Sequence, residues 1–164
     1  MAGAGKTRSP AIKSEAGLAV TKERDLYSWA ARQATLLRAG RVAEIDAAAI
    51  AEEIDDVGEE QYDKLESALR VLMLHLLKWD HQPDKRSRSW TASVREQRRR
   101  VLRQLRKNPG LRSRLNEALG EAYEDARDEA SGETGLPVSV FPERRPFEYA
   151  EIIERSIVWP GDEH

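Results

Sequence analysis

The sequence predicts an all-α protein: a single-domain helical bundle of about five main helices around a central apolar helix (residues 59–81), with a short C-terminal helix. Charged residues make up 34% of the chain, and Ala, Leu, Glu and Arg, which are abundant, lose little side-chain freedom in helices. Strand-like alternation occurs only over residues 136–141, where prolines bracket the apolar part. Elsewhere the apolar residues recur at helical spacing, which is typical of amphipathic helices.

The central helix carries the strongest signal in the chain. Its first half has apolar residues on one face, and over residues 71–77 (VLMLHLL) the pattern becomes apolar on every side except at His75. A helix that is apolar all round has to be covered all round. We therefore expect the other helices to pack about this one.

The first predicted helix covers about residues 23–39. Thr21 or Asp25 can accept a hydrogen bond from a free backbone N–H group at its start, and Gly40 suits the stop at its end. Its apolar residues fall on one stripe, which predicts a single buried face.

The second predicted helix begins near Asp46, a favourable cap, and ends near Gly58, a favourable stop. Ile54 and Val57 are expected to face inward. Glu53 shares their face, and a carboxylate there needs a partner or takes a raised pKa.

Three further helices are predicted after the central one. The first runs over about residues 87–107, with Ser87 or Ser89 as its cap. The second starts at an Asn-Pro pair and runs over about residues 108–130, and a short helix follows at about residues 148–155. The sequence thus predicts a disordered tail (1–20), a helical-bundle domain (21–155) and a C-terminal tail (156–164).

Composition excludes several classes of protein. The sequence has no Cys, so disulfides, thiolate metal sites and a cysteine nucleophile are excluded. No apolar run reaches the roughly 20 residues that span a bilayer, and the N-terminus lacks the apolar core of a secretory signal. We expect a cytoplasmic protein with no membrane partner.

Charges of opposite sign are segregated along the chain, although the net charge is only −2. Acidic residues dominate residues 44–66, basic residues dominate 85–114, and the following helix is acidic again. The favoured interpretation is that the basic helix packs between the acidic helices and its arginines pair with them. The alternatives are a partner contact and binding of nucleic-acid phosphates. The residues that would form such a surface are Arg95, Arg99, Arg100, Arg103 and Arg106.

Glu53, Glu66 and His75 are the candidates for catalysis or metal binding, because imidazole can act as acid, base or ligand near neutral pH. The favoured interpretation of His75 is a core histidine bonded to a carboxylate or a carbonyl group. The di-metal pattern of helical bundles needs a Glu three residues before the His, and that position is Leu72. No cofactor motif is found, and we expect no cofactor.

A second candidate site is the corner where the central helix meets the basic helix. An anion there would meet several hydrogen-bond donors and the N-terminus of a helix. The favoured interpretation is instead a tryptophan-rich packing corner. The residues concerned are Lys78, Trp79, Arg88, Ser89 and Trp90.

Several stretches in a fixed order resemble an uncharacterised bacterial family catalogued as domain of unknown function 29. They are DLYSWAARQATLLRAGR, AEEIDDVG, ESALRVLMLHLLKWDHQP, RSRSWTASVREQRR and EAYEDARDEASGETGLPVSVFPERRPF. The resemblance covers about residues 23–155. It implies an all-helical bundle and assigns no activity, so no residue inherits a catalytic role from it.

The leading hypothesis for function is a non-enzymatic bundle that binds a protein partner or itself through its segregated charges. An enzyme is the second hypothesis: a hydrolase or transferase, with a metal or with His75 as the acting group, whose site includes Glu53, His75 and Arg88. Binding of nucleic acid through residues 87–107 is the third. The sequence leaves the question of enzymatic activity open.

Overall fold

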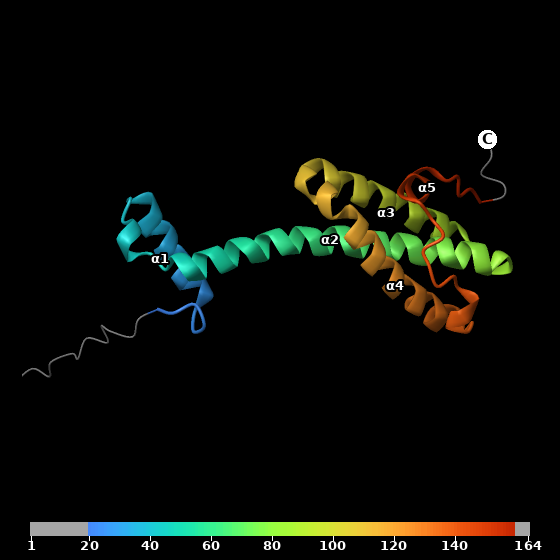
Figure 1. Ribbon diagram of the computed structural model, residues 1–164, viewed down its shortest axis with the longest axis horizontal. Helices are drawn as coiled ribbons and strands as arrows, with labels where there is room; N and C mark the ends of the chain where they lie inside the picture. The colour runs from blue at the N-terminus through green and yellow to red at the C-terminus, as the bar shows by residue number, and fades with distance from the viewer. Residues whose placement is uncertain (1–19, 160–164) are drawn as a thin grey trace, which may run out of the picture. The chain divides into compact units, whose positions relative to one another are not determined.

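The computed structural model describes residues 20–159, and Figure 1 shows how their helices are arranged. The predicted all-α class is confirmed, since the described residues form helices, turns and loops without a strand. The predicted tails fall mostly outside the described residues. The α-helices are α1 (Leu26–Arg38), α2 (Ala47–His81), α3 (Arg88–Lys107), α4 (Leu115–Thr134) and α5 (Tyr149–Glu154). Short 3₁₀ turns cover Val42–Glu44, Pro83–Lys85, Pro109–Arg114 and Val138–Val140.

The chain forms two compact units, and the division falls within α2, between Glu53 and Ile54. Of the described residues, the first unit holds α1 and the start of α2. The second unit holds the rest of α2 and the remaining helices. No helix of the described chain is both long enough and apolar enough to cross a bilayer.

In the first unit, side chains cap both helices as the sequence predicts. Asp25 Oδ1 accepts a hydrogen bond from Ser28 N at 3.0 Å, and Asp46 Oδ1 accepts one from Ala49 N at 3.1 Å. Gly40 takes a positive φ of 69° directly after α1, where a residue with a Cβ would be strained. Trp29 of α1 is buried.

In the second unit, α2 lies between α3 and α4 (Figure 1). This arrangement confirms the expectation that the apolar part of α2 is covered by other helices. The half of α2 that follows Gln61 supplies more of the core than any other element, and side chains of α3, α4 and the C-terminal segment complete it. Fully buried members include Leu65, Leu69, Leu72, Met73, Leu76, Leu77, Val94, Val101, Leu105, Leu119, Phe141 and Ile152.

The prediction that one helix ends at Gly58 and another begins at residue 59 is wrong, because α2 runs unbroken from Ala47 to His81. Gly58 does not take a positive φ, so it acts as an ordinary helical residue. A glycine inside a helix costs about 1 kcal/mol relative to alanine, which the packing of a long helix can offset. The expected inward packing of Ile54 and Val57 is also wrong, since they are 65% and 60% exposed.

The prediction for the helix after α3 is partly wrong. The Asn108-Pro109 pair starts a 3₁₀ turn, and α4 begins only at Leu115. At its other end α4 continues past Gly132 to Thr134, where Gly135 with φ 72° ends it.

Candidate functional site: the arginine face of α3

α3 has one buried face and one strongly basic face. Ser87 Oγ caps the helix by accepting a hydrogen bond from Trp90 N at 3.4 Å. Thr91, Val94, Val101 and Leu105 form the buried row. Four arginines spaced four, four and three residues apart lie on a neighbouring arc of the helix, because such spacing keeps side chains on one side. These exposed residues, which we call the arginine stripe, are Arg95, Arg99, Arg103 and Arg106.

None of the four side chains forms an ion pair with another residue of the described chain, since the ion pairs there involve other cations. Arg100, the fifth arginine of the predicted surface, pairs with Glu96 of its own helix at 2.6 Å. Leu102 is 44% exposed and lies three residues after Arg99 and four before Arg106. The face therefore combines unpaired guanidinium groups with an exposed apolar side chain.

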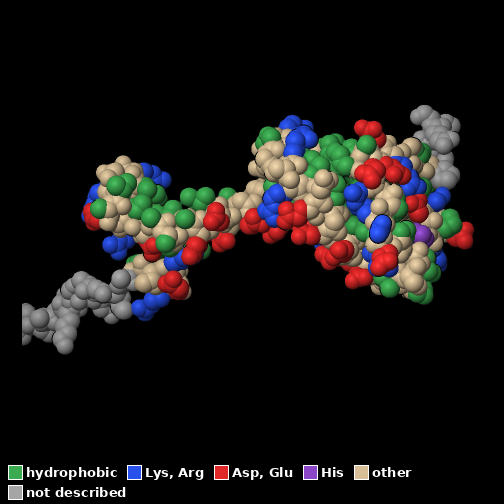
Figure 2. Space-filling model, in the orientation of Figure 1, with side chains coloured by type: hydrophobic (Ala, Val, Ile, Leu, Met, Phe, Trp, Pro, Cys, Tyr) green, Lys and Arg blue, Asp and Glu red, His purple; other side chains and the backbone are tan. Residues whose placement is uncertain are grey.

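Three acidic residues of α4 contact α2, and no acidic residue of α4 pairs with the arginine stripe in the described chain. Arg70 forms an ion pair with Glu129, and Lys78 forms one with Glu133. Tyr62 Oη donates a hydrogen bond to Glu121 Oε2 at 2.6 Å, and burial is the main cause that raises the pKa of Tyr62. Figure 2 shows acidic side chains in a row along α4.

The interpretation that acidic helices cover the arginines of α3 is therefore wrong for the described residues. Glu129 and Glu133 of α4 pair with cations of α2, and no acidic side chain of the described residues pairs with the stripe. One arginine of α3 is turned inward. Arg98 Nε donates to the Ile152 carbonyl oxygen at 2.9 Å, and burial lowers the pKa of Arg98.

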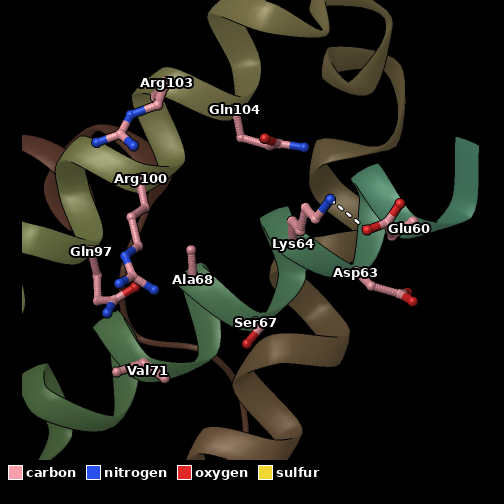
Figure 3. A pocket seen from close by; sticks show the side chains of 10 residues that line it. All are labelled: Glu60, Asp63, Lys64, Ser67, Ala68, Val71, Gln97, Arg100, Arg103 and Gln104. Atoms are coloured by element: carbon pink, nitrogen blue, oxygen red, sulfur yellow. Dashed lines mark hydrogen bonds and ion pairs between the residues drawn. The ribbon is translucent and has the colours of Figure 1, made fainter. Parts of the chain in front are cut away.

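An open groove of about 530 Å³ lies between α2 and α3, beside the stripe (Figure 3). Its lining residues are Glu60, Asp63, Lys64, Ser67, Ala68, Val71, Gln97, Arg100, Arg103 and Gln104. Lys64 forms an ion pair with Glu60 at 2.6 Å, as the dashed line in Figure 3 marks. Because both signs of charge line the groove, it favours neither an anion nor a cation.

At the corner of α2 and α3, the structure brings Lys78 and Trp90 together. The Lys78 ammonium lies 4.7 Å from the centre of the Trp90 ring, a cation–π contact, and Glu133 accepts a hydrogen bond from it. Trp79 lies instead beneath the guanidinium of Arg86, at 4.6 Å. The Lys78 ammonium thus already has an aromatic and a carboxylate contact within the chain.

The other two residues of that corner lie at the start of α3. The Ser89 hydroxyl is 2.8 Å from the Ser87 hydroxyl, so a hydrogen bond within the first turn engages it. Arg88 is exposed. The contacts at this corner join helices of the second unit, and the structure places no unpaired ammonium there for an anion.

The three candidates for catalysis or metal binding do not form one cluster. Glu53 belongs to the first unit, where it pairs with Lys22 at 2.9 Å. Glu66 and His75 are nine residues apart on α2, so they project from opposite faces and are separated by about 14 Å along the axis. The described residues contain no group of three or more His, Asp or Glu side chains placed to hold a metal ion.

Burial shifts the pKa values of His75 and Glu66 in opposite directions. His75 Nδ1 lies 2.8 Å from the Val71 carbonyl oxygen, which can only accept, so Nδ1 carries a proton. Burial lowers the pKa of His75, and burial raises the pKa of Glu66. The contact of His75 agrees with its interpretation as a histidine bonded to a carbonyl group.

Two exposed apolar features of the second unit are absent from the sequence-based expectations. One is Leu102, although its spacing from Arg99 and Arg106 places it beside them on α3. The other is the exposed segment of α2 around Ile54 and Val57, because an apolar pair at helical spacing is usually buried. Whether such residues are covered depends on helices that are distant in the sequence.

Comparison with known proteins gives one match. No curated protein and no solved structure matches the chain. A family model described as "Domain of unknown function DUF29" matches residues 22–158, which includes α1 to α5 and thus nearly all of the described chain. The chain therefore belongs to the DUF29 family.

Proposed function

We propose that this chain is a protein-binding module, and that the arginine stripe of α3 binds an acidic surface on a protein partner. One observation carries this proposal: four exposed arginines share a face without an ion pair in the described chain, although acidic side chains pair with cations elsewhere. The arginines are thus available to a second molecule.

The chemistry of the face suits a protein partner. Arginine presents a planar fork of donors that matches a carboxylate, and it is enriched in the buried centres of protein interfaces. Leu102 adds an apolar contact within the stripe. Exposed ion pairs contribute little free energy by themselves, so an apolar side chain among the arginines supports a protein interface more than a purely ionic one.

Several features favour a protein over a nucleic acid. Trp90 is the only aromatic residue of α3, and it packs against the core and not on the exposed face. Single-stranded nucleic acids are usually bound by aromatic side chains interleaved with basic ones. The groove beside the stripe is lined by Glu60 and Asp63 as well as by basic residues, so it does not extend the stripe into a purely basic surface. The net charge of the chain is −2.

An enzymatic function receives less support from the same structure. Glu66 and His75 project from opposite faces of α2, and Glu53 is engaged by Lys22 in the first unit. A general base has to reach the group that it acts on, at about 3 Å or through one water. These residues do not share a cavity with a nucleophile in the described chain.

The proposal can be tested by affinity capture with three forms of the full chain. The baits are the wild type, the stripe variant Arg95→Glu/Arg99→Glu/Arg103→Glu, and the dispersed control Arg24→Glu/Lys85→Glu/Arg144→Glu. The two variants change the net charge equally, and the three control residues are exposed and form no ion pair in the described chain. Bound proteins are identified by mass spectrometry from a lysate of the cells that encode the chain.

We expect the wild type and the dispersed control to retain the same protein, and the stripe variant to retain much less of it. Retention should fall as salt is raised, because exposed charges are screened over about 8 Å at physiological ionic strength. Equal capture by all three baits would overturn the proposal. Capture that nuclease treatment abolishes would assign the stripe to nucleic acid instead.

A further inference from the structure

The second unit carries another uncovered surface, on α2. Every residue from Ile54 to Glu60 is exposed, although the segment lies in the interior of a long helix. Ile54 and Val57 are three residues apart and therefore lie on one face, where they are 65% and 60% exposed. Neighbouring exposed apolar side chains that are rimmed by charged residues mark an interaction surface, and no element of the second unit covers these two.

The exposed apolar pair is surrounded by carboxylates. The segment Ile54–Glu60, which we call the acidic segment, also contains Asp55, Asp56 and Glu59 and has no basic residue. Asp55 and Asp56 form no ion pair within the described chain. Glu59 contacts Arg114 at 2.8 Å, and Glu60 pairs with Lys64.

The acidic segment and the arginine stripe carry opposite charges, and both present exposed apolar side chains. One surface presents two exposed apolar residues among carboxylates, and the other presents exposed Leu102 among guanidinium groups. Both surfaces are helical and both belong to the second unit. Within one chain neither covers the other, since the residues of both remain exposed.

We propose that the partner of the arginine stripe is a second copy of this chain, which docks through its acidic segment. This inference rests on the proposed function, because it names the occupant of the same stripe. Leu102 of one copy packs on Ile54 and Val57 of the other, and the guanidinium groups pair with the surrounding carboxylates. Each copy carries both surfaces, so the contact is heterologous and every association leaves one stripe and one acidic segment free for a further contact.

A charge exchange between the two surfaces tests the inference. The stripe variant is Arg99→Glu/Arg103→Glu, the segment variant is Asp55→Arg/Asp56→Arg, and the control is Lys85→Glu/Arg144→Glu. The mass of each full-length protein is measured by sedimentation over a range of concentrations, and circular dichroism checks that the helices persist.

We expect the wild type and the control to self-associate, and each of the other variants alone to be monomeric. In a stripe variant the glutamates face the acidic segment, and in a segment variant arginines face arginines, so both contacts are repulsive. An equimolar mixture of the two variants should associate again, because both contacts between unlike copies are then complementary. Restoration in the mixture also shows that neither variant failed to fold.

A second variant tests the apolar part of the contact. Ile54→Ala/Val57→Ala removes exposed apolar area and favours the helix, so the fold is retained while self-association weakens by at least about tenfold. An unchanged association constant in this variant would mean that the acidic segment is not the contact.

The outcomes separate the inference from the proposed function. A wild type that stays monomeric while the stripe still captures another protein would overturn the second copy as partner and leave the protein-binding module intact. Self-association that survives both charge reversals would also overturn the inference. Loss of both self-association and stripe-dependent capture would remove the two proposals together.

Discussion

The ammonium group of Lys78 donates a hydrogen bond to the carboxylate of Glu133, which joins the second half of α2 to the last turn of α4. The two partners are unequally buried, because the side chain of Lys78 is 11% exposed and that of Glu133 is 50% exposed. The loss of stability on removing Lys78 should therefore differ from the loss on removing Glu133.

We predict that Glu133→Ala destabilises the protein more than Lys78→Met does. The first change leaves a buried ammonium with only the Trp90 ring, at a cost of about 1–2 kcal/mol. The second keeps the apolar stem and releases Glu133 to water, at a cost below about 1 kcal/mol. Urea unfolding measures the change in the free energy of unfolding for each variant. Glu124→Ala, at an exposed position of α4, serves as the control. The opposite order would show that the ion pair is not the stabilising contact.

The carboxyl group of Glu66 predicts a pH dependence of stability. Burial raises the pKa of Glu66, and its Oε1 atom is buried without a hydrogen-bond partner. A raised pKa in the folded state means that folding favours the protonated form. The contribution of Glu66 to stability is thus fully present below its ordinary pKa of 4.5 and is lost as the pH rises through the raised value.

Glu66→Gln removes this dependence. We expect the variant to be more stable than the wild type at neutral pH, and equally stable below about pH 4. Urea unfolding of both proteins across this range measures the difference. A Glu66→Gln variant that is less stable at neutral pH would show that attraction to nearby Arg70 outweighs burial.

The continuity of α2 predicts the effect of Gly58→Ala. A Cβ atom at Gly58 would meet no other heavy atom within 4 Å, and the residue does not need a positive φ. The substitution should therefore raise the free energy of unfolding by about 0.5–1 kcal/mol. Gly135→Ala is the matched control, because Gly135 has φ 72° and alanine there should destabilise. Destabilisation at both positions would indicate a helix break at Gly58.

The contact between Arg155 and Asp80 predicts that lysine cannot replace this arginine. The guanidinium makes two hydrogen bonds to the Asp80 carboxylate, one of them between Nη1 and Oδ2 at 2.8 Å. Asp80 is also the main cause that raises the pKa of Arg155. Arg155 directly follows α5, so the contact fastens this segment to the end of α2.

We expect Arg155→Lys to cost about 1 kcal/mol, because an ammonium cannot reproduce the paired geometry. A double-mutant cycle with Asp80→Asn measures the coupling between the two residues in urea unfolding. Arg144→Lys, at an exposed position, serves as the control and should change stability little. A coupling energy near zero would show that the pair contributes nothing to stability.

The candidate site was predictable in part. Helical spacing alone places Arg95, Arg99 and Arg103 on one side of a helix. The sequence could not decide whether acidic helices cover them, because that depends on which side of α2 each neighbour packs. Glu66 and His75 lie on opposite faces by spacing as well, so their separation could have been inferred once one continuous helix was assigned.

The helical class and most helix starts follow from local sequence. Asp25, Asp46 and Ser87 cap their helices as expected, because a cap is a hydrogen bond between residues two or three positions apart. The apolar period likewise determined which part of α2 is buried, since the burial of Leu65 to Leu77 follows from local composition.

The features on which the proposals rest depend on packing between distant parts of the chain. The passage of α2 through Gly58, the exposure of Ile54 and Val57, and the pairing of α4 carboxylates with α2 depend on contacts between distant residues. Local preferences at these positions amount to about 1 kcal/mol or less, and the burial of a single large apolar side chain exceeds that. Packing therefore determined which surfaces of this protein are left free for a partner.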